Sequence, residues 1–174
     1  VLYTLLLAFL LGREIFASVC QPTETVYFWR LQNGGSGIYT IDPMSNLPPE
    51  PVRAQNSAGC VGCHTISASS GRIAAITTTA TGFLQITTLD GQTVQTPGVR
   101  ASYLAWSPDG NRLAFSQNDE DVAILDIDSG SITLVPGASD PDVIETMPSW
   151  SPDGQTLAFV RSTRSESGFN VTHD

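Results

Sequence analysis

The sequence predicts an all-β fold: β-propeller blades of four-stranded antiparallel sheets, incomplete in this chain, preceded by one N-terminal transmembrane helix. Three observations lead to this prediction. A ten-residue unit that begins at Trp106 recurs 44 residues later, at Trp150. Short apolar runs alternate with turn residues from about residue 25 onward, as in repeated strands. The chain opens with an apolar segment, which favours a membrane helix before the strands.

The repeated unit consists of a W-S-P-D-G turn followed by a short apolar strand. It spans residues 106–115 and 150–159, and a degenerate copy that lacks the Trp spans residues 66–75. A period of about 40–45 residues with only strand and turn signals is typical of a propeller blade. In the Ser-Pro-Asp-Gly turn, proline fixes φ at the second position and glycine takes the fourth. Each copy therefore predicts an inner strand, a tight turn and the second strand of one blade.

The remaining apolar runs predict the other strands of the blades. Residues 122–127 and 132–135 predict the third and outer strands of the blade that contains Trp106. Further partial blades are expected, and their strands fall at residues 26–31 and 38–42 before the repeats and at residues 159–161 and 169–171 after them. Residues 23–174 are thus expected to form the propeller fragment, with the haem site described below at residues 60–64.

Residues 1–22 are expected to form a transmembrane anchor. Residues 1–11 and 15–20 are almost wholly apolar, and Gly12, Arg13 and Glu14 separate them. An uncleaved signal-like segment is the alternative, because the first apolar run is shorter than the roughly 20 residues that a spanning helix needs. The cysteine that ends the second run, Cys20, is also a candidate for lipidation.

The strongest chemical signal is the run Cys60-Val61-Gly62-Cys63-His64, which reads C-x-x-C-H. This spacing is the attachment signature of a c-type haem. Two cysteine sulfurs two residues apart reach the two vinyl groups on one edge of the porphyrin. His64 then offers an imidazole nitrogen to the iron as the proximal ligand. The sequence predicts one haem c, attached covalently through Cys60 and Cys63.

Two other kinds of site use a C-x-x-C pair. A structural zinc site needs four ligands, and only Cys20 and His173 remain to complete one. A thioredoxin-like redox pair expects a βαβ context, which the sequence lacks. Haem is joined to cysteines outside the cytoplasm, so we expect the propeller on the periplasmic or extracellular side of the membrane.

The repeats resemble the WD-type repeats of the TolB-like propeller family. The core W-S-P-D-G-x-x-L-A-F is present twice, and the resemblance covers roughly residues 25–174. Haem-attaching members of this broad group place C-x-x-C-H just before a degenerate repeat, and here the motif ends two residues before Ile66. The resemblance implies a propeller of six or more blades, of which this chain would supply about four, counting the partial ones.

The repeat alignment also predicts where the haem lies. Cys63 is equivalent to Tyr103 and to Met147, and His64 is equivalent to Leu104. These positions stand two or three residues before the Trp of the repeat, where the inner strand enters the blade. We therefore expect the haem at one mouth of the central channel, with Tyr103 as a possible haem contact.

A sixth ligand to the haem iron is expected from a short set of candidates. Met147 occupies the equivalent position on a neighbouring blade and is the possible distal ligand. Core filling is the alternative role for a methionine before a propeller Trp. Met44 lies in a predicted exposed turn, and His173 lies beside the last residue of the chain.

Charge and cofactor together suggest the function. The chain has 17 acidic and 8 basic residues and a formal net charge of −9, which argues against nucleic acid and favours a redox partner with a basic docking face. The main expectation is a membrane-anchored c-type cytochrome that relays electrons within a larger respiratory or photosynthetic complex. The alternative is a TolB-like propeller scaffold for protein–protein interaction in a membrane complex, with a structural or sensory haem. Peroxidase-type catalysis is not expected, because Arg100 alone stands near the place of a distal catalytic group.

Overall fold

The computed structural model describes residues 25–32, 35–53, 60–78, 83–118 and 120–163, and these residues form strands and turns without a helix. The strands are β1 (Val26–Gln32), β2 (Gly35–Ile41), β3 (Glu50–Arg53), β4 (Cys60–Ser67), β5 (Arg72–Thr78), β6 (Phe83–Thr88), β7 (Thr93–Gln95), β8 (Ala101–Trp106), β9 (Arg112–Gln117), β10 (Asp121–Asp126), β11 (Ile132–Leu134), β12 (Val143–Trp150) and β13 (Leu157–Thr163).

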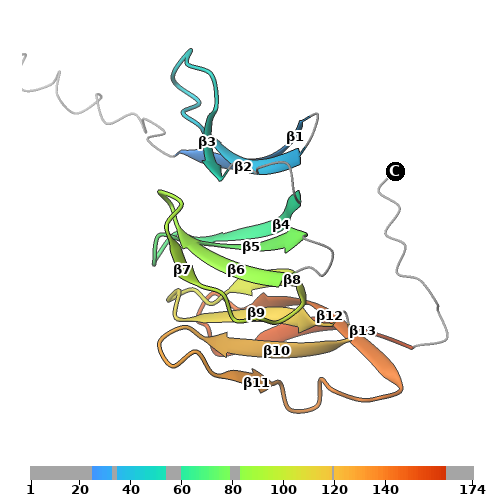
Figure 1. Cartoon of the computed structure of the whole chain (residues 1–174). Helices are drawn as coiled ribbons and strands as arrows, with labels where there is room; N and C mark the ends of the chain where they lie inside the picture. The colour runs from blue at the N-terminus through green and yellow to red at the C-terminus, as the bar shows by residue number, and fades with distance from the viewer. Residues whose placement is uncertain (1–24, 33–34, 54–59, 79–82, 119, 164–174) are drawn as a thin grey trace, which may run out of the picture.

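The strands group into four units, which we call the first blade (β1–β3), second blade (β4–β7), third blade (β8–β11) and fourth blade (β12–β13). The second and third blades are antiparallel meanders of four strands. A single parallel pair, Ser36 with Cys60, joins the first blade to the second. Figure 1 shows the first three blades stacked on one another, and β12 of the fourth blade contacts β8, β9 and β10 of the third. The predicted all-β blade architecture is confirmed.

The Ser-Pro-Asp-Gly turns are closed by hydrogen bonds to the backbone and side chain of their serine. In the third blade, the amide of Gly110 donates to the carbonyl of Ser107 at 2.8 Å, and the amide of Arg112 donates to the hydroxyl oxygen of Ser107 at 2.9 Å. The Ser107 hydroxyl also donates to Asp109 at 2.5 Å, and this bond is the largest cause that lowers the pKa of that carboxyl. The same amide bonds to Ser151 recur in the fourth blade.

The buried apolar side chains form two clusters, one on each face of the second blade. Ile73 and Ala75 of β5 face the first blade, whereas Ala74 and Ile76 belong to the larger core shared with the third blade. Phe115, which lies in the larger core, is fully buried. A sheet that packs on both faces has strands that are apolar throughout, which explains the continuous run of apolar residues in β5 and β9.

Two tryptophans link the third and fourth blades to the blades that precede them. The indole of Trp106 donates to the carbonyl of Thr65 on β4 at 3.3 Å, and the indole of Trp150 donates to the carbonyl of Ala105 on β8 at 3.2 Å. The two acceptors are equivalent residues of successive blades. The Trp of the repeat therefore joins neighbouring blades as well as filling the core.

Two arginines make the reverse link, from the second and third blades to the turn of the blade that follows. Arg72 donates to the carbonyl of Gly110 at 3.5 Å, and Arg112 donates to the carbonyl of Gly154 at 2.9 Å. The guanidinium carbon of Arg112 also lies 4.5 Å from the centre of the Trp150 ring. The turns of neighbouring blades are thus held together by contacts that recur in successive copies of the sequence repeat.

Gly110→Ala is expected to destabilise the protein by about 2–4 kcal/mol, from left-handed strain plus overpacking. Gly110 has φ +72, and a Cβ there would lie 2.6 Å from the Ser67 hydroxyl oxygen and 2.7 Å from the Ser70 Cβ. Gly98 is the matched control, because it has φ +73 and nothing within 4 Å of the added Cβ. Gly98→Ala should cost about 1 kcal/mol. Equal losses for the two variants in urea unfolding would contradict close packing between these turns.

Some predictions from the sequence are confirmed by the strands, and others fall at the ends of the chain. The strands predicted at residues 26–31, 38–42, 122–127 and 132–135 are present as β1, β2, β10 and β11. The expected anchor at residues 1–22, the possible lipidation site at Cys20 and the strand at residues 169–171 lie outside the described residues. Within the described ranges, no helix has the length and apolar character needed to cross a membrane.

Candidate haem site

The C-x-x-C-H motif lies at the start of β4. The backbone of Cys60 pairs with Thr78 of β5 on one side and with Ser36 of β2 on the other. The register between β4 and β5 shifts between Gly62 and His64, so that β4 contains a β-bulge at this point. The side chains of Cys60 and Cys63 lie outside what the structure describes, and their attachment roles stay predictions.

The same bulge recurs on the first strands of the next two blades. The register shifts within residues 102–105 of β8 and within residues 146–149 of β12. Tyr103 and Met147 lie in these bulges with φ values of 48 and 53. This agrees with the sequence equivalence between Cys63, Tyr103 and Met147. A left-handed backbone costs an ordinary residue about 1–2 kcal/mol, so both positions are strained.

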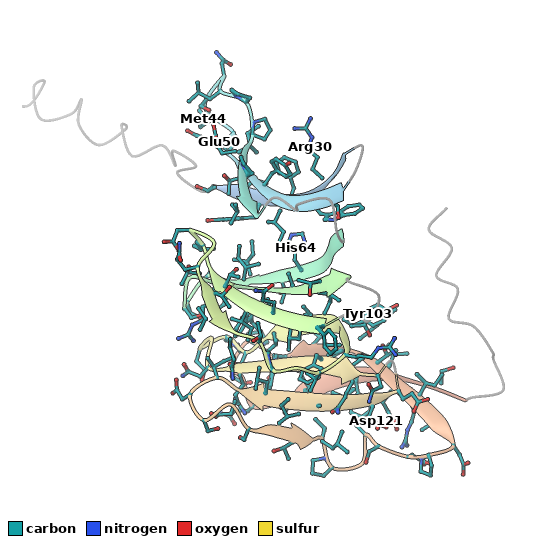
Figure 2. All side chains as sticks on the ribbon, viewed as in Figure 1. Arg30, Met44, Glu50, His64, Tyr103 and Asp121 are labelled. Carbon is teal, nitrogen blue, oxygen red and sulfur yellow. The ribbon has the colours of Figure 1, made fainter. Side chains whose placement is uncertain are left out.

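The side chain of His64 is turned toward the first blade. His64 lies opposite Ala75 in the register of β4 and β5, and directly opposed residues project from the same face of a sheet. Ala75 packs with Ile38 of β2, so His64 shares that face, and Figure 2 shows it between β2 and β4. The predicted place of the haem at the channel mouth stays a prediction. The bulge inserts an extra residue before His64, which changes the face from which later side chains project.

His64 is a half-buried histidine in a largely apolar setting. Burial lowers the pKa of its imidazole, because the charged form is costly to desolvate. The neutral imidazole is the form that binds a metal ion. The environment of His64 therefore suits a ligand to iron.

The second blade presents smaller side chains to its preceding neighbour than the third blade does. The two blades differ at three equivalent positions on the face turned to the preceding blade. The second blade has His64 where the third has Leu104, Ile66 where it has Trp106 and Ala75 where it has Phe115. Two of these replacements remove an aromatic ring. The first and second blades are nevertheless in contact here, because Ala75 is 3% exposed and packs with Ile38 of β2.

The other predicted site residues are not placed beside His64. β8 contacts β4 on one side and β12 on the other, so Met147 lies two strands away from the motif. Figure 2 shows Tyr103 well apart from His64. Met44 lies in an exposed turn, as expected, and is 67% exposed. The roles of Tyr103 as a haem contact and Met147 as a distal ligand stay predictions, and the arrangement does not favour them.

The remaining two candidates add little to the site. Arg100, considered as a distal catalytic group, is exposed and pairs through its backbone with Phe83 at the edge of β6. His173 lies outside the described residues. Among the described side chains, no group of three or more His, Cys, Asp and Glu is arranged to hold a metal ion.

Sequence reasoning missed a buried ion pair in the fourth blade. Glu145 of β12 is fully buried, and its Oε1 accepts from Arg161 Nε at 3.0 Å and Nη2 at 2.9 Å. Arg161 also lies 3.7 Å from Asp140 and donates to the carbonyl of Gly137 at 3.3 Å. The sequence shows Glu145 as a single acidic residue within β12, which indicates a buried charge. It does not show the partner, because Arg161 lies on another strand.

Comparisons with known proteins agree with the fold. The model of the anaphase-promoting complex subunit 4 WD40 domain matches residues 68–145, which run from the turn after β4 to the start of β12. The structure titled putative TolB from Agrobacterium tumefaciens is 18% identical, with a TM-score of 0.55, and the match covers 82% of this chain and 56% of that one. TolB from Acinetobacter baumannii is 16% identical, with a TM-score of 0.53, and the match covers 76% of this chain and 33% of that one.

A third solved structure comes from an enzyme. Prolyl oligopeptidase B from Galerina marginata, in its apo form, is 14% identical with a TM-score of 0.54, and the match covers 84% of this chain and 23% of that one. No curated protein matches the sequence. Identities this low establish the fold alone. The chain therefore has a TolB-like, WD40-type β-propeller fold, and it spans about half the length of the Agrobacterium structure that it resembles.

Proposed function

We propose that this chain is a TolB-like propeller scaffold that carries one covalently attached haem c. The observation that supports this most directly is the composition of a single interblade face. The one repeat preceded by C-x-x-C-H is also the repeat in which Phe115 is replaced by Ala75 and Leu104 by His64. His64 on this face is half-buried, and burial lowers the pKa of its imidazole, which favours the neutral form that binds iron.

Three residues would hold the haem. Cys60 and Cys63 would supply the thioether sulfurs, and the imidazole of His64 would bind the iron. The strand pairing of β4 with β5 fixes the backbone of Cys60 and His64, with Cys63 in the bulge between them, which lowers the entropic cost of ligation. The haem, when bound, would supply one-electron redox chemistry at a potential tuned by burial and hydrogen bonding.

The architecture supports the scaffold function. Stacked blades joined by recurring indole and guanidinium contacts form a rigid body that presents its loops to other proteins. The haem would then be structural or sensory. The proposed setting is a membrane complex, reached through residues 1–22, with the propeller on the periplasmic or extracellular side.

Electron relay is the second candidate, and the C-x-x-C-H motif favours it. A net charge of −9 suits docking to a redox partner with a basic face. The two candidates differ in one measurable property. A relay exchanges electrons with an added basic carrier protein at a rate that falls steeply with salt, whereas a structural haem does not exchange them. Stopped-flow reduction at two ionic strengths distinguishes the two.

Cys63→Ala is expected to weaken the covalent attachment of haem, because one of two thioether bonds is removed. The protein would be expressed with haem-ligation machinery and extracted with acidic acetone. We expect the intact protein to retain its haem and the variant to release more of it. Cys20→Ala is the matched control, since it removes a cysteine outside the motif. Equal haem retention in the Cys63→Ala variant and the intact protein would contradict attachment at this cysteine.

A further inference from the structure

The loop between β2 and β3 of the first blade displays two large apolar side chains to solvent. Leu47 is 72% exposed and Met44 is 67% exposed, the two highest values among the large apolar side chains that the structure describes. Figure 2 shows Met44 at the outer end of the first blade, far from His64 and from Asp121 of the third blade. Single exposed apolar residues are common, but two within four residues at one tip indicate a contact with an apolar partner.

The backbone of this loop depends little on water for its hydrogen bonds. Residues 43–49 include three prolines, which have no amide hydrogen to donate. The amide of Met44 donates to Asp42 Oδ1 at 2.9 Å, and the amide of Ser45 donates to the carbonyl of Asp42 at 3.1 Å. The amide of Leu47 donates to the hydroxyl oxygen of Ser45 at 3.3 Å. Backbone donors that are bonded within the loop can leave water at small cost, which is a condition for contact with lipid.

The strand pairing places this loop beside the part of the chain that leads to the predicted anchor. Val26, the first residue of β1, pairs with Ile41, the last residue of β2, and the loop starts at the next residue. The predicted anchor ends at residue 22, so at most about 14 Å of extended chain separates it from Val26. The headgroup layer of a bilayer is about 5–8 Å thick. This linker is too short to hold the first blade far from a membrane that residues 1–22 cross.

We propose that the β2–β3 loop docks on the surface of the lipid bilayer, with Met44 and Leu47 buried at the boundary between headgroups and acyl chains. The proposal rests on the membrane setting of the proposed function, because residues 1–22 bring the loop to the bilayer. Asp42 and Glu50 flank the loop and are exposed, and the net charge of the chain is −9, so the lipid is zwitterionic rather than anionic. The docked loop fixes the orientation of the propeller on the membrane.

The first test is photo-crosslinking from residue 47. The full chain is reconstituted in phosphatidylcholine vesicles with p-benzoylphenylalanine in place of Leu47, and lipid adducts are measured by mass spectrometry. We expect a lipid adduct at this position. The matched control is the same replacement at Leu134, a leucine of β11 in the third blade that is 43% exposed. No lipid adduct is expected there.

The second test separates docking of the loop from closeness to the anchor. The crosslinker replaces Val26, which is 46% exposed, in a chain that also carries Met44→Asp and Leu47→Asp. Aspartate side chains stay in water, so the lipid adduct at residue 26 is expected to fall several-fold. Val94→Asp with Leu134→Asp is the matched control, because both residues are 43% exposed on the outer strands of other blades. This control pair leaves the adduct unchanged, and circular dichroism establishes that both double variants are folded.

The outcomes separate the docked loop from the proposed function. A lipid adduct at residue 47 and none at residue 134, with the loss at residue 26 in the Met44→Asp and Leu47→Asp chain, supports docking. A vesicle-bound chain without an adduct at residue 47, or with an adduct at residue 26 that survives both aspartates, overturns docking and leaves the membrane setting standing. A chain that does not float with the vesicles overturns docking and contradicts the membrane setting as well.

Discussion

Phe115→Ala is expected to lower the free energy of unfolding by about 3–5 kcal/mol. Phe115 is the largest of the fully buried side chains, and it lies in the core between the second and third blades with Ile76, Leu84 and Leu125. Its removal leaves a cavity that is lined by strands of two different sheets. Because paired strands relax only partially, the lost packing adds to the lost transfer free energy.

The control for this prediction is Phe83→Ala. Phe83 begins β6 and is 39% exposed, so we expect its removal to cost under about 1 kcal/mol. Urea unfolding followed by fluorescence gives both values. A loss at Phe115 no larger than the loss at Phe83 would mean that the second and third blades do not share a core.

Arg161→Met is the second large effect, with an expected loss of about 3 kcal/mol. The variant leaves the carboxylate of Glu145 fully buried without its guanidinium partner. Oε2 of Glu145 already has no hydrogen-bond partner among the described residues. The cost arises from the uncompensated charge, because half of the Arg161 side chain is exposed and contributes less burial.

A double variant separates charge from packing at this site. Glu145→Gln combined with Arg161→Met removes the buried charge and keeps the shape of residue 145. We expect the double variant to recover part of the stability that Arg161→Met alone loses. A double variant less stable than both single variants in thermal unfolding would contradict an uncompensated charge as the cause.

The blades could be predicted because their signals are local. Trp106 and Trp150 mark the ends of equivalent strands, and the Ser-Pro-Asp-Gly turns set the reversal that follows each one. The bulge equivalence of Cys63 with Tyr103 also follows from the repeat spacing. These features depend on residues within one repeat, so a single sequence suffices to place them.

The features that could not be predicted depend on residues far apart in the chain. The face of His64 is set by an extra residue in β4, and the sequence shows this only when Ala75 is known to lie opposite. The pairing of Glu145 with Arg161 joins two strands of the fourth blade, and acidic residues in strands give no signal of their partners.

The mass of the intact protein, measured after expression with haem-ligation machinery, tests the central claim most directly. We predict the chain mass plus that of one haem, together with a pyridine haemochrome spectrum typical of two thioether bonds. Simultaneous Cys60→Ala and Cys63→Ala substitution should return the mass to that of the polypeptide alone. A colourless intact protein with the mass of the unmodified polypeptide would contradict the haem site.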